Sequence, residues 1–132
     1  MNTLNKFSGY AHWGIRLAVA GVFLFHGLQK VTHPAGGAMM GMPTLIWLLV
    51  GLAEAGGGAL ILAGAFLPDW ATRLGGLLII PPMLGAIAMV HWGQWSFVPS
   101  ESHPMGGMEF QFTLLMLGVY FLLKGKGVQE SA

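Results

Sequence analysis

Long apolar runs separated by short polar segments dominate the chain. The runs cover about residues 13–31, 43–67, 70–92 and 109–123. A helix needs roughly 20 residues to cross the hydrocarbon core of a bilayer, and only the last run falls slightly short of that length. Hydrophobic and polar residues do not alternate within the runs, as they would in the strands of a membrane barrel. The pattern therefore predicts an all-α protein, an integral membrane four-helix bundle that forms a single domain over 1–132.

Composition supports a membrane protein. Hydrophobic residues make up 55% of the 132 residues and charged residues 8%, which is too few to cover a soluble domain. The net charge of +1 indicates no nucleic-acid partner. No cysteine is present, so the chain has no disulfide, thiolate metal site or dithiol couple. The first run lacks a convincing cleavage site, and we expect it to be retained as a span.

The distribution of positive charge predicts the orientation. If successive helices alternate in direction, Lys6, Arg16, Arg73, Lys124 and Lys126 all fall at one end of the bundle, and Lys30 falls alone at the other. Cytoplasmic segments of membrane proteins are enriched in lysine and arginine. Both termini are therefore expected in the cytoplasm, with the connections between the first and second and between the third and fourth helices on the opposite side.

Glu54 is the least expected residue, because it lies near the middle of the second apolar run. Insertion scales assign a charged side chain at that depth a cost of about 2.5 to 3.5 kcal/mol. One interpretation is a proton relay. The other is structural: a protonated carboxyl hydrogen-bonded to a backbone carbonyl or to Arg16, joining two helices. The sequence leaves both open.

Other polar residues gather toward the extracytoplasmic ends of the helices. His26, Gln29 and His33 have the i, i+3, i+7 spacing of one helix face. His91 repeats the His-x-x-Gln pattern, and Glu109 opens the fourth helix, where the helix dipole alone would favour a carboxylate. These groups predict a polar pocket, unless His26 and His91 are separately satisfied histidines at the interface.

Such a pocket suits a quinone, because imidazoles can donate to its carbonyl oxygens and a carboxyl can pass protons. A metal within the membrane is disfavoured, since the Glu-x-x-His spacing of di-iron bundles is missing. A Cu(I) site in the loops is a weaker alternative, because methionines are common apolar fillers. Its ligands would be His33, Met39, Met40, Met42, His103, Met105 and Met108.

Three local patterns concern packing. His-Pro-x-Gly-Gly occurs at residues 33–37 and again at 103–107, each time after a His-x-x-Gln. The echo predicts two helix hairpins related by a pseudo-twofold axis along the membrane normal, although turn chemistry explains the glycines alone. The second run is rich in glycine and is expected at the packing centre. Pro81 and Pro82 predict a kink in the third helix. One interpretation is that the kink makes room for a ligand, and the other is that it only bends a packing helix.

The ordered set of polar and glycine positions resembles the DoxX family of small four-helix membrane proteins. The matching segments are Arg16 with Phe25-His26-Gly27-Leu28-Gln29-Lys30, Gly51-Leu52-Ala53-Glu54 with Gly57-Gly58-Ala59-Leu60, His91, Gly107-Met108-Glu109, and Lys124-Gly125-Lys126-Gly127. The chain departs from the family pattern after Gly127, where Val128-Gln129-Glu130 replaces a Ser-Leu-Asp-like end. The resemblance adds Arg16 and Lys30 to the candidate pocket of His26, Gln29, Glu54, His91 and Glu109.

The resemblance implies a redox setting. Some DoxX members are membrane subunits of thiosulfate:quinone oxidoreductase, and others accompany oxidative-stress assemblies. By that likeness we expect an accessory subunit in a bacterial or archaeal cytoplasmic membrane, with other membrane proteins as partners and a quinone as the candidate cofactor. The alternative is a purely structural subunit that docks onto larger membrane proteins. The sequence does not decide the oligomeric state or whether the subunit is itself catalytic.

Overall fold

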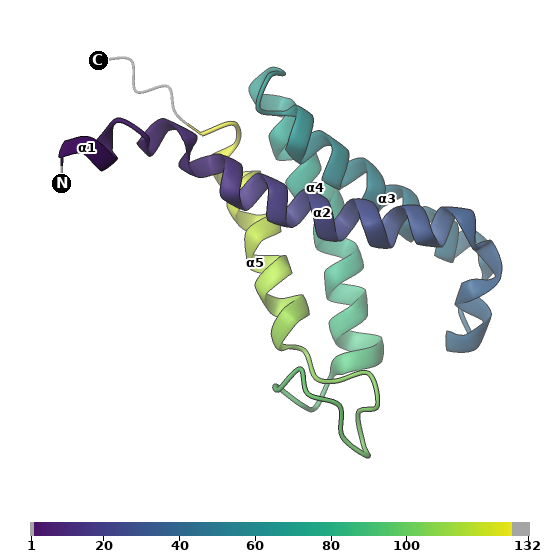
Figure 1. Ribbon diagram of the computed structural model, residues 1–132. Coiled ribbons are helices and arrows are strands. Elements are labelled where there is room, and N and C mark those ends of the chain that lie inside the picture. Colours follow the sequence, from purple (N-terminus) through teal and green to yellow (C-terminus); the bar gives the residue numbers. More distant parts are fainter. Residues whose placement is uncertain (1, 128–132) are drawn as a thin grey trace.

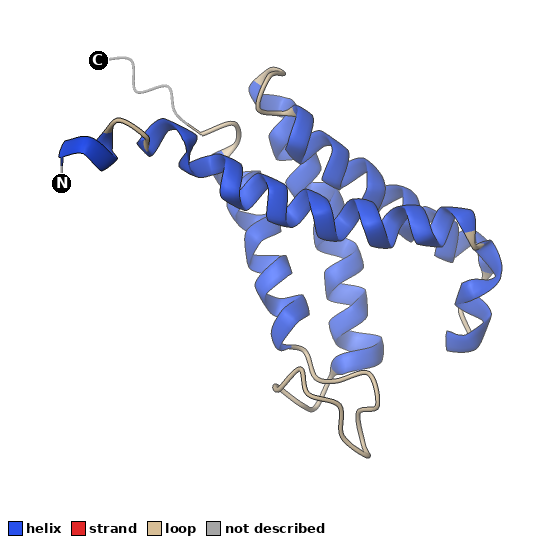
Figure 2. Ribbon diagram, in the orientation of Figure 1, coloured by secondary structure: helices blue, strands red, loops and turns tan. Residues whose placement is uncertain are grey.

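The computed structural model describes residues 2–127, and those residues contain helices and loops but no strand (Figures 1 and 2). The expected all-α class is confirmed. The four long helices are α2 (Ala11–Thr32), α3 (Thr44–Ala63), α4 (Asp69–Ala86) and α5 (Glu109–Lys124). The short elements are α1 (Asn2–Asn5), the 3-10 helices η1 (Ser8–Tyr10) and η2 (Pro34–Met40), and the π-helix η3 (Ile87–His91). Val128-Gln129-Glu130 lie outside the described residues.

Within residues 2–127, three helical segments are long and apolar enough to cross a membrane. They are Ser8–Thr32, Thr44–Ala63 and Asp69–His91. The fourth, α5, has 16 residues, about 24 Å at the usual rise and shorter than a typical hydrocarbon core of ~30 Å. α3 ends at Ala63, before the expected limit of the 43–67 run. The chain turns there ahead of Pro68, because a proline disfavours helical geometry in the residue before it.

The long helices form two hairpins, α2 with α3 and α4 with α5, and the hairpins cross each other (Figure 1). Each helix packs on the next in sequence, so α3 contacts both α2 and α4. Glycines face each other across every one of these contacts. A Cβ added to Gly27 would lie 2.7 Å from the Gly51 carbonyl oxygen. The other facing pairs are Gly57 with Gly75, and Gly76 with Gly118. Small residues thus let the helix backbones approach closely. Within a bilayer, where the hydrophobic effect does not drive helices together, this close packing stabilises the helix contacts.

The apolar core lies where the hairpins meet. Its buried members are Val19, Phe23, Ile61, Ile79, Met83, Ile87, Leu114, Leu115 and Phe121. Many large apolar side chains remain exposed outside this core, among them Phe25, Leu49 and Leu123. A soluble protein rarely exposes so much contiguous apolar surface, whereas lipid covers it in a bilayer. The fold therefore agrees with an integral membrane location.

Arg16 joins four parts of the chain at one end of the molecule. Its side chain is buried, and Nη1 donates to the Ile61 carbonyl and to Thr72 Oγ1, the latter at 3.0 Å. Nη2 donates to the Lys126 carbonyl at 3.0 Å, and Nε to His12 Nδ1 at 3.1 Å. The start of α2, the end of α3, the start of α4 and the segment after α5 therefore gather at the same end.

A second network holds the segment after α5 at that end. Asp69 pairs with Arg73 and accepts a 2.7 Å hydrogen bond from the Lys126 backbone nitrogen. Arg73 also donates to the carbonyls of Leu122 and Leu123, at 2.9 and 2.8 Å. These are among the last carbonyls of α5, which have no partner within the helix. Gly125 has a φ of +68°, and a Cβ there would collide with the Asp69 carboxylate.

Candidate functional site

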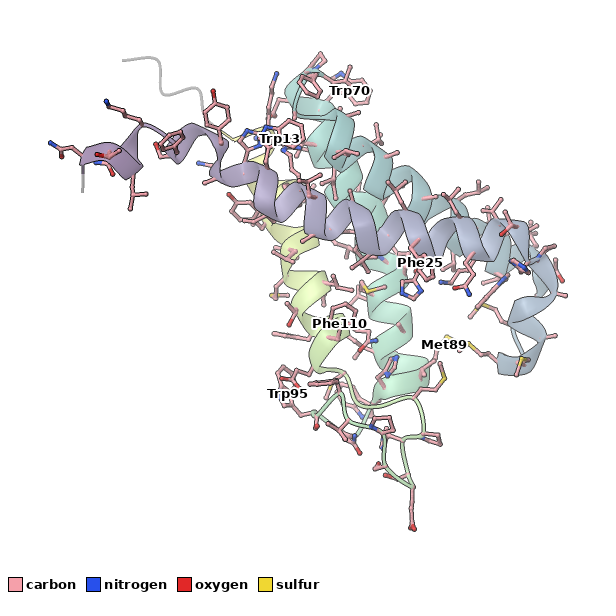
Figure 3. The ribbon with its side chains drawn as sticks, viewed as in Figure 1. Trp13, Phe25, Trp70, Met89, Trp95 and Phe110 are labelled. Carbon is pink, nitrogen blue, oxygen red and sulfur yellow. The ribbon has the colours of Figure 1, made fainter. Side chains whose placement is uncertain are left out.

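A cavity of about 750 Å³ lies between the two hairpins. We call it the interhairpin cleft. Residues of all four long helices and η3 line it, polar ones among them from α2, α3, η3 and α5, and most of the remaining wall is aliphatic, aromatic or methionine. Its polar and aromatic lining consists of Phe23, His26, Gln29 and Lys30 of α2, Trp47 and Glu54 of α3, His91 of η3, and Phe110 and Gln111 of α5. Figure 3 shows Met89 of η3, another lining residue, pointing toward the far end of the α2–α3 hairpin.

The structure brings five of the seven candidate residues to this cleft: His26, Gln29, Lys30, Glu54 and His91. Arg16 lies elsewhere, in the network described above. Glu109 lines a separate cavity of about 450 Å³. Its Oε2 accepts a 3.3 Å hydrogen bond from the Phe97 backbone nitrogen.

Glu54 forms an ion pair with Lys30, at 2.8 Å between Oε2 and Nζ. The Glu54 side chain is 5% exposed and that of Lys30 16%. Lys30 Nζ also lies 5.2 Å from the ring centre of Trp47, within reach of a cation–π contact. Gly51 makes room for this arrangement, because a Cβ there would lie 2.7 Å from Lys30 Cβ. The expectation that Glu54 would hydrogen-bond to Arg16 or to a backbone carbonyl is wrong. Glu54 pairs with Lys30, and the Arg16 side chain is hydrogen-bonded at the other end of the molecule.

His91 has one ring nitrogen committed. Nδ1 lies 2.8 Å from the Gly106 carbonyl oxygen, and a carbonyl only accepts, so Nδ1 carries the hydrogen. In the neutral ring, Nε2 is then an acceptor. His91 ends the π-helix η3, which follows α4 five residues after Pro82. Prolines 81 and 82 donate no backbone hydrogen bonds, yet α4 continues through them to Ala86 before the helix widens.

Gln111 belongs to the site, although we did not predict it from the sequence. It lines both cavities, and its Oε1 is enclosed without a hydrogen-bond partner among the described residues. A buried acceptor left unpaired costs roughly 1–3 kcal/mol. The signal that could have revealed it is a polar amide inside the 109–123 apolar run, where a bilayer span has few such residues.

The two His-Pro-x-Gly-Gly loops do not share a conformation. The first forms η2, and its Gly36 and Gly37 lie under the Trp47 ring. The second is irregular, and its Gly106 has a φ of +81°.

The loop histidines hydrogen-bond within or next to their own loops. His33 Nδ1 lies 3.2 Å from the Gln29 carbonyl oxygen, and His103 Nε2 lies 2.6 Å from that of Trp92. The echo in sequence therefore does not extend to a repeated loop structure.

The candidate Cu(I) ligands do not all line one cavity. Among the described residues, no group of three or more histidines, aspartates and glutamates is placed to hold a metal ion. Met40, Met42 and Met105 line the interhairpin cleft, whereas Met39 is almost fully exposed. The first three methionines therefore contribute to the wall of the cleft, where a flexible thioether side chain adapts to the shape of an apolar ligand.

Comparison with known proteins supplies the family. The DoxX family model matches residues 12–92, which run from α2 to the residue after η3. The matched segment contains the Lys30–Glu54 pair, His26 and His91. None of the curated proteins and none of the solved structures compared with this chain matches it. Because the matched segment covers more than half of the 132 residues, the chain belongs to the DoxX family.

Proposed function

We propose that this DoxX-family protein is a membrane subunit of a redox complex and that its interhairpin cleft binds the ring of a quinone-type lipid. The observation that supports this proposal is the cleft itself. Its volume of about 750 Å³ and largely apolar wall are typical of small-molecule sites, in which a few convergent polar groups fix the orientation of the ligand. The position of the cleft between membrane helices suits a ligand that arrives from the bilayer.

The chain's own residues supply binding and proton transfer in this proposal. The ion pair of Lys30 with Glu54 places two opposite charges at the wall without adding net charge to the cleft. His26 is exposed and lines the cleft, so it is placed to exchange protons with a bound ring. A partner subunit with a flavin, haem or iron–sulfur centre supplies or accepts the electrons, because this cysteine-free chain has no dithiol couple.

We also propose that the chain crosses the membrane four times, with both termini in the cytoplasm. The Arg16 network gathers the start of α2 and the segment after α5 at one end. Lys6 precedes α2, and Lys124 and Lys126 end and follow α5, so these positive charges belong to the same end. Local thinning of the bilayer accommodates the short α5 at a modest energetic cost. The interhairpin cleft then lies in the extracytoplasmic half of the membrane, near the loop at residues 92–108.

Two glycines allow a direct test of ligand binding. Gly85 lines the cleft, whereas Gly21 of α2 does not, and a Cβ at either position meets no atom within 4 Å. Gly85→Leu should therefore fill part of the cleft without disturbing the helices, and Gly21→Leu is the matched control. We expect Gly85→Leu to weaken the binding of a short-chain benzoquinone by ~10-fold, about 1.4 kcal/mol, and Gly21→Leu to leave it unchanged.

Binding would be measured on the full chain in lipid nanodiscs, by titration calorimetry. A Gly85→Leu protein that binds the quinone as tightly as the wild type does would argue against this cleft. If Gly85→Leu changes only the yield of a co-purified complex, and no quinone binds to the wild type, the cleft instead serves a structural docking role.

A further inference from the structure

We infer that the loop at residues 92–108 lies in the membrane interface and contacts lipid, instead of extending into water. This loop joins η3 to α5 and closes the α4–α5 hairpin (Figure 1). Arg16 bonds to Thr72 and Lys126 near the other end of that hairpin. The inference rests on the proposed four-span arrangement and does not depend on the ligand of the interhairpin cleft.

The 92–108 loop exposes large apolar side chains over much of its length. More than half of the side-chain surface is exposed at Trp92, Trp95, Phe97, Val98 and Met105. Glu101 is the only aspartate, glutamate, lysine or arginine in the loop. Tryptophan is enriched where a membrane meets water, because its ring is apolar and its N–H can bond near the headgroups. The composition of the loop therefore favours contact with lipid.

The backbone of the loop forms many hydrogen bonds within the loop and with the start of α5. Residues 107–109 donate their backbone N–H groups to the carbonyls of residues 94–96, at 2.7–2.9 Å. The Gln94 side chain donates to the carbonyls of Ser96 and Val98, both at 2.8 Å. Backbone groups that enter an apolar phase must be paired within the protein, whereas water pairs them in an aqueous loop. The loop thus has the hydrogen bonding that entry into the edge of a bilayer requires.

The apolar surface of the loop continues onto α5. The Trp95 ring packs edge-on against the exposed Phe112 ring of α5, at 5.4 Å between ring centres. Figure 3 shows Trp95 where the loop meets α5. Lipid covers the exposed apolar side chains of α5 in a bilayer, so it also covers the neighbouring side chains of the loop.

The length of α5 gives the loop a further role in the membrane. The 16 residues of α5 extend about 24 Å, less than the ~30 Å of a typical hydrocarbon core. A loop embedded at the end of this helix fills part of the missing thickness. It therefore reduces the local thinning of the bilayer that the short α5 requires.

Single cysteines in this cysteine-free chain test the inference. Val98→Cys and Trp92→Cys place thiols at exposed apolar positions of the loop, and Glu101→Cys is the matched control at an exposed charged position. Met116→Cys marks the exposed side of α5. Each full-length variant would be placed in lipid nanodiscs at one copy per disc, and its rate of reaction with a membrane-impermeant maleimide measured.

We expect Val98→Cys and Trp92→Cys to react ~10-fold more slowly than Glu101→Cys, because the reagent stays in water and a thiol in an apolar setting forms little of the reactive thiolate. Met116→Cys should be at least as well protected. The rates should converge in sodium dodecyl sulfate, which unfolds the loop. A bimane attached at residue 98 should also be quenched several-fold more strongly by a headgroup-linked nitroxide lipid than a bimane at residue 101.

The outcomes separate the inference from the arrangement on which it rests. If Val98→Cys reacts as fast as Glu101→Cys while Met116→Cys is protected, the loop extends into water, and the inference is overturned with the four spans intact. If Met116→Cys also reacts as fast, α5 does not lie in the bilayer, and both fail. Slow labelling of Val98→Cys without quenching by the nitroxide lipid would show that protein covers the loop, which contradicts lipid contact.

Discussion

At the scale of single residues, two networks of charged side chains lie at different places in the protein. Arg16, Asp69 and Arg73 bond to backbone atoms of other segments and hold one end of the molecule together. Lys30 and Glu54 bond to each other at the wall of the interhairpin cleft. The sequence showed that Glu54 needs a partner. It did not show which cation would reach it, because that depends on how α2 packs on α3 at Gly51.

The Lys30–Glu54 pair yields a prediction about stability. Removal of one partner leaves a charge in an apolar setting, so Glu54→Gln or Lys30→Met alone should each lower the free energy of unfolding by about 3 kcal/mol or more. The double variant Lys30→Met with Glu54→Leu should lose less than the sum of the single losses, because no charge remains unpaired. Denaturant titrations in detergent would measure all of these variants. Additive losses in the cycle would contradict a direct pair.

At the scale of helices, apolar run length alone was enough to predict where the long helices lie, because a bilayer demands long unbroken apolar segments. The π-helix η3 was not predictable in this way. It ends at His91, whose ring contacts the carbonyl of Gly106, 15 residues further along the chain, and no local sequence pattern shows that contact. The different conformations of the two His-Pro-x-Gly-Gly loops could not be predicted from the sequence either. The glycines of the first loop pack against Trp47, and those of the second pack against the backbone of residues 94–97.

The facing glycines yield a prediction about packing. An added Cβ at Gly27 would lie 2.3 Å from the Ala55 backbone nitrogen, whereas one at Gly21 on the same helix meets nothing within 4 Å. Gly27→Ala should therefore separate α2 from α3 and lower the thermal unfolding midpoint by several degrees. Gly21→Ala should leave the midpoint unchanged or raise it, because alanine favours a helix by up to about 1 kcal/mol over glycine. Equal midpoints for the two variants would contradict the close helix contact.

At the scale of the whole molecule, the candidate site depends on how the two hairpins cross (Figure 1). His26 and Glu54 come from one hairpin and His91 and Gln111 from the other. The sequence supplied most of these residues as isolated polar positions in apolar runs. It could not show that Glu109 faces a different cavity, that Arg16 sits at the opposite end, or that Gln111 belongs to the cleft. Those assignments follow from the crossing, which depends on the glycine contacts of α3 with α4.

The proposed orientation of the whole molecule can be tested with single cysteines, because the native chain has none. Glu101 lies in an exposed loop, and a Cβ added at Gly9, near the other end, meets no atom within 4 Å. We expect a membrane-impermeant maleimide to label Glu101→Cys in intact cells and to label Gly9→Cys only after permeabilisation. The reverse pattern would place the termini outside the cytoplasm.

The central claim, that the interhairpin cleft binds a quinone-type lipid, is tested most directly by photolabelling. The full chain in nanodiscs would be irradiated with a photoreactive short-chain benzoquinone, and the modified residues located by mass spectrometry. The account predicts labels on cleft residues such as Trp47, Met83 and Met89, which an excess of the unmodified quinone removes. Labels spread over lipid-facing residues such as Leu17 and Leu123, with no such competition, would contradict it.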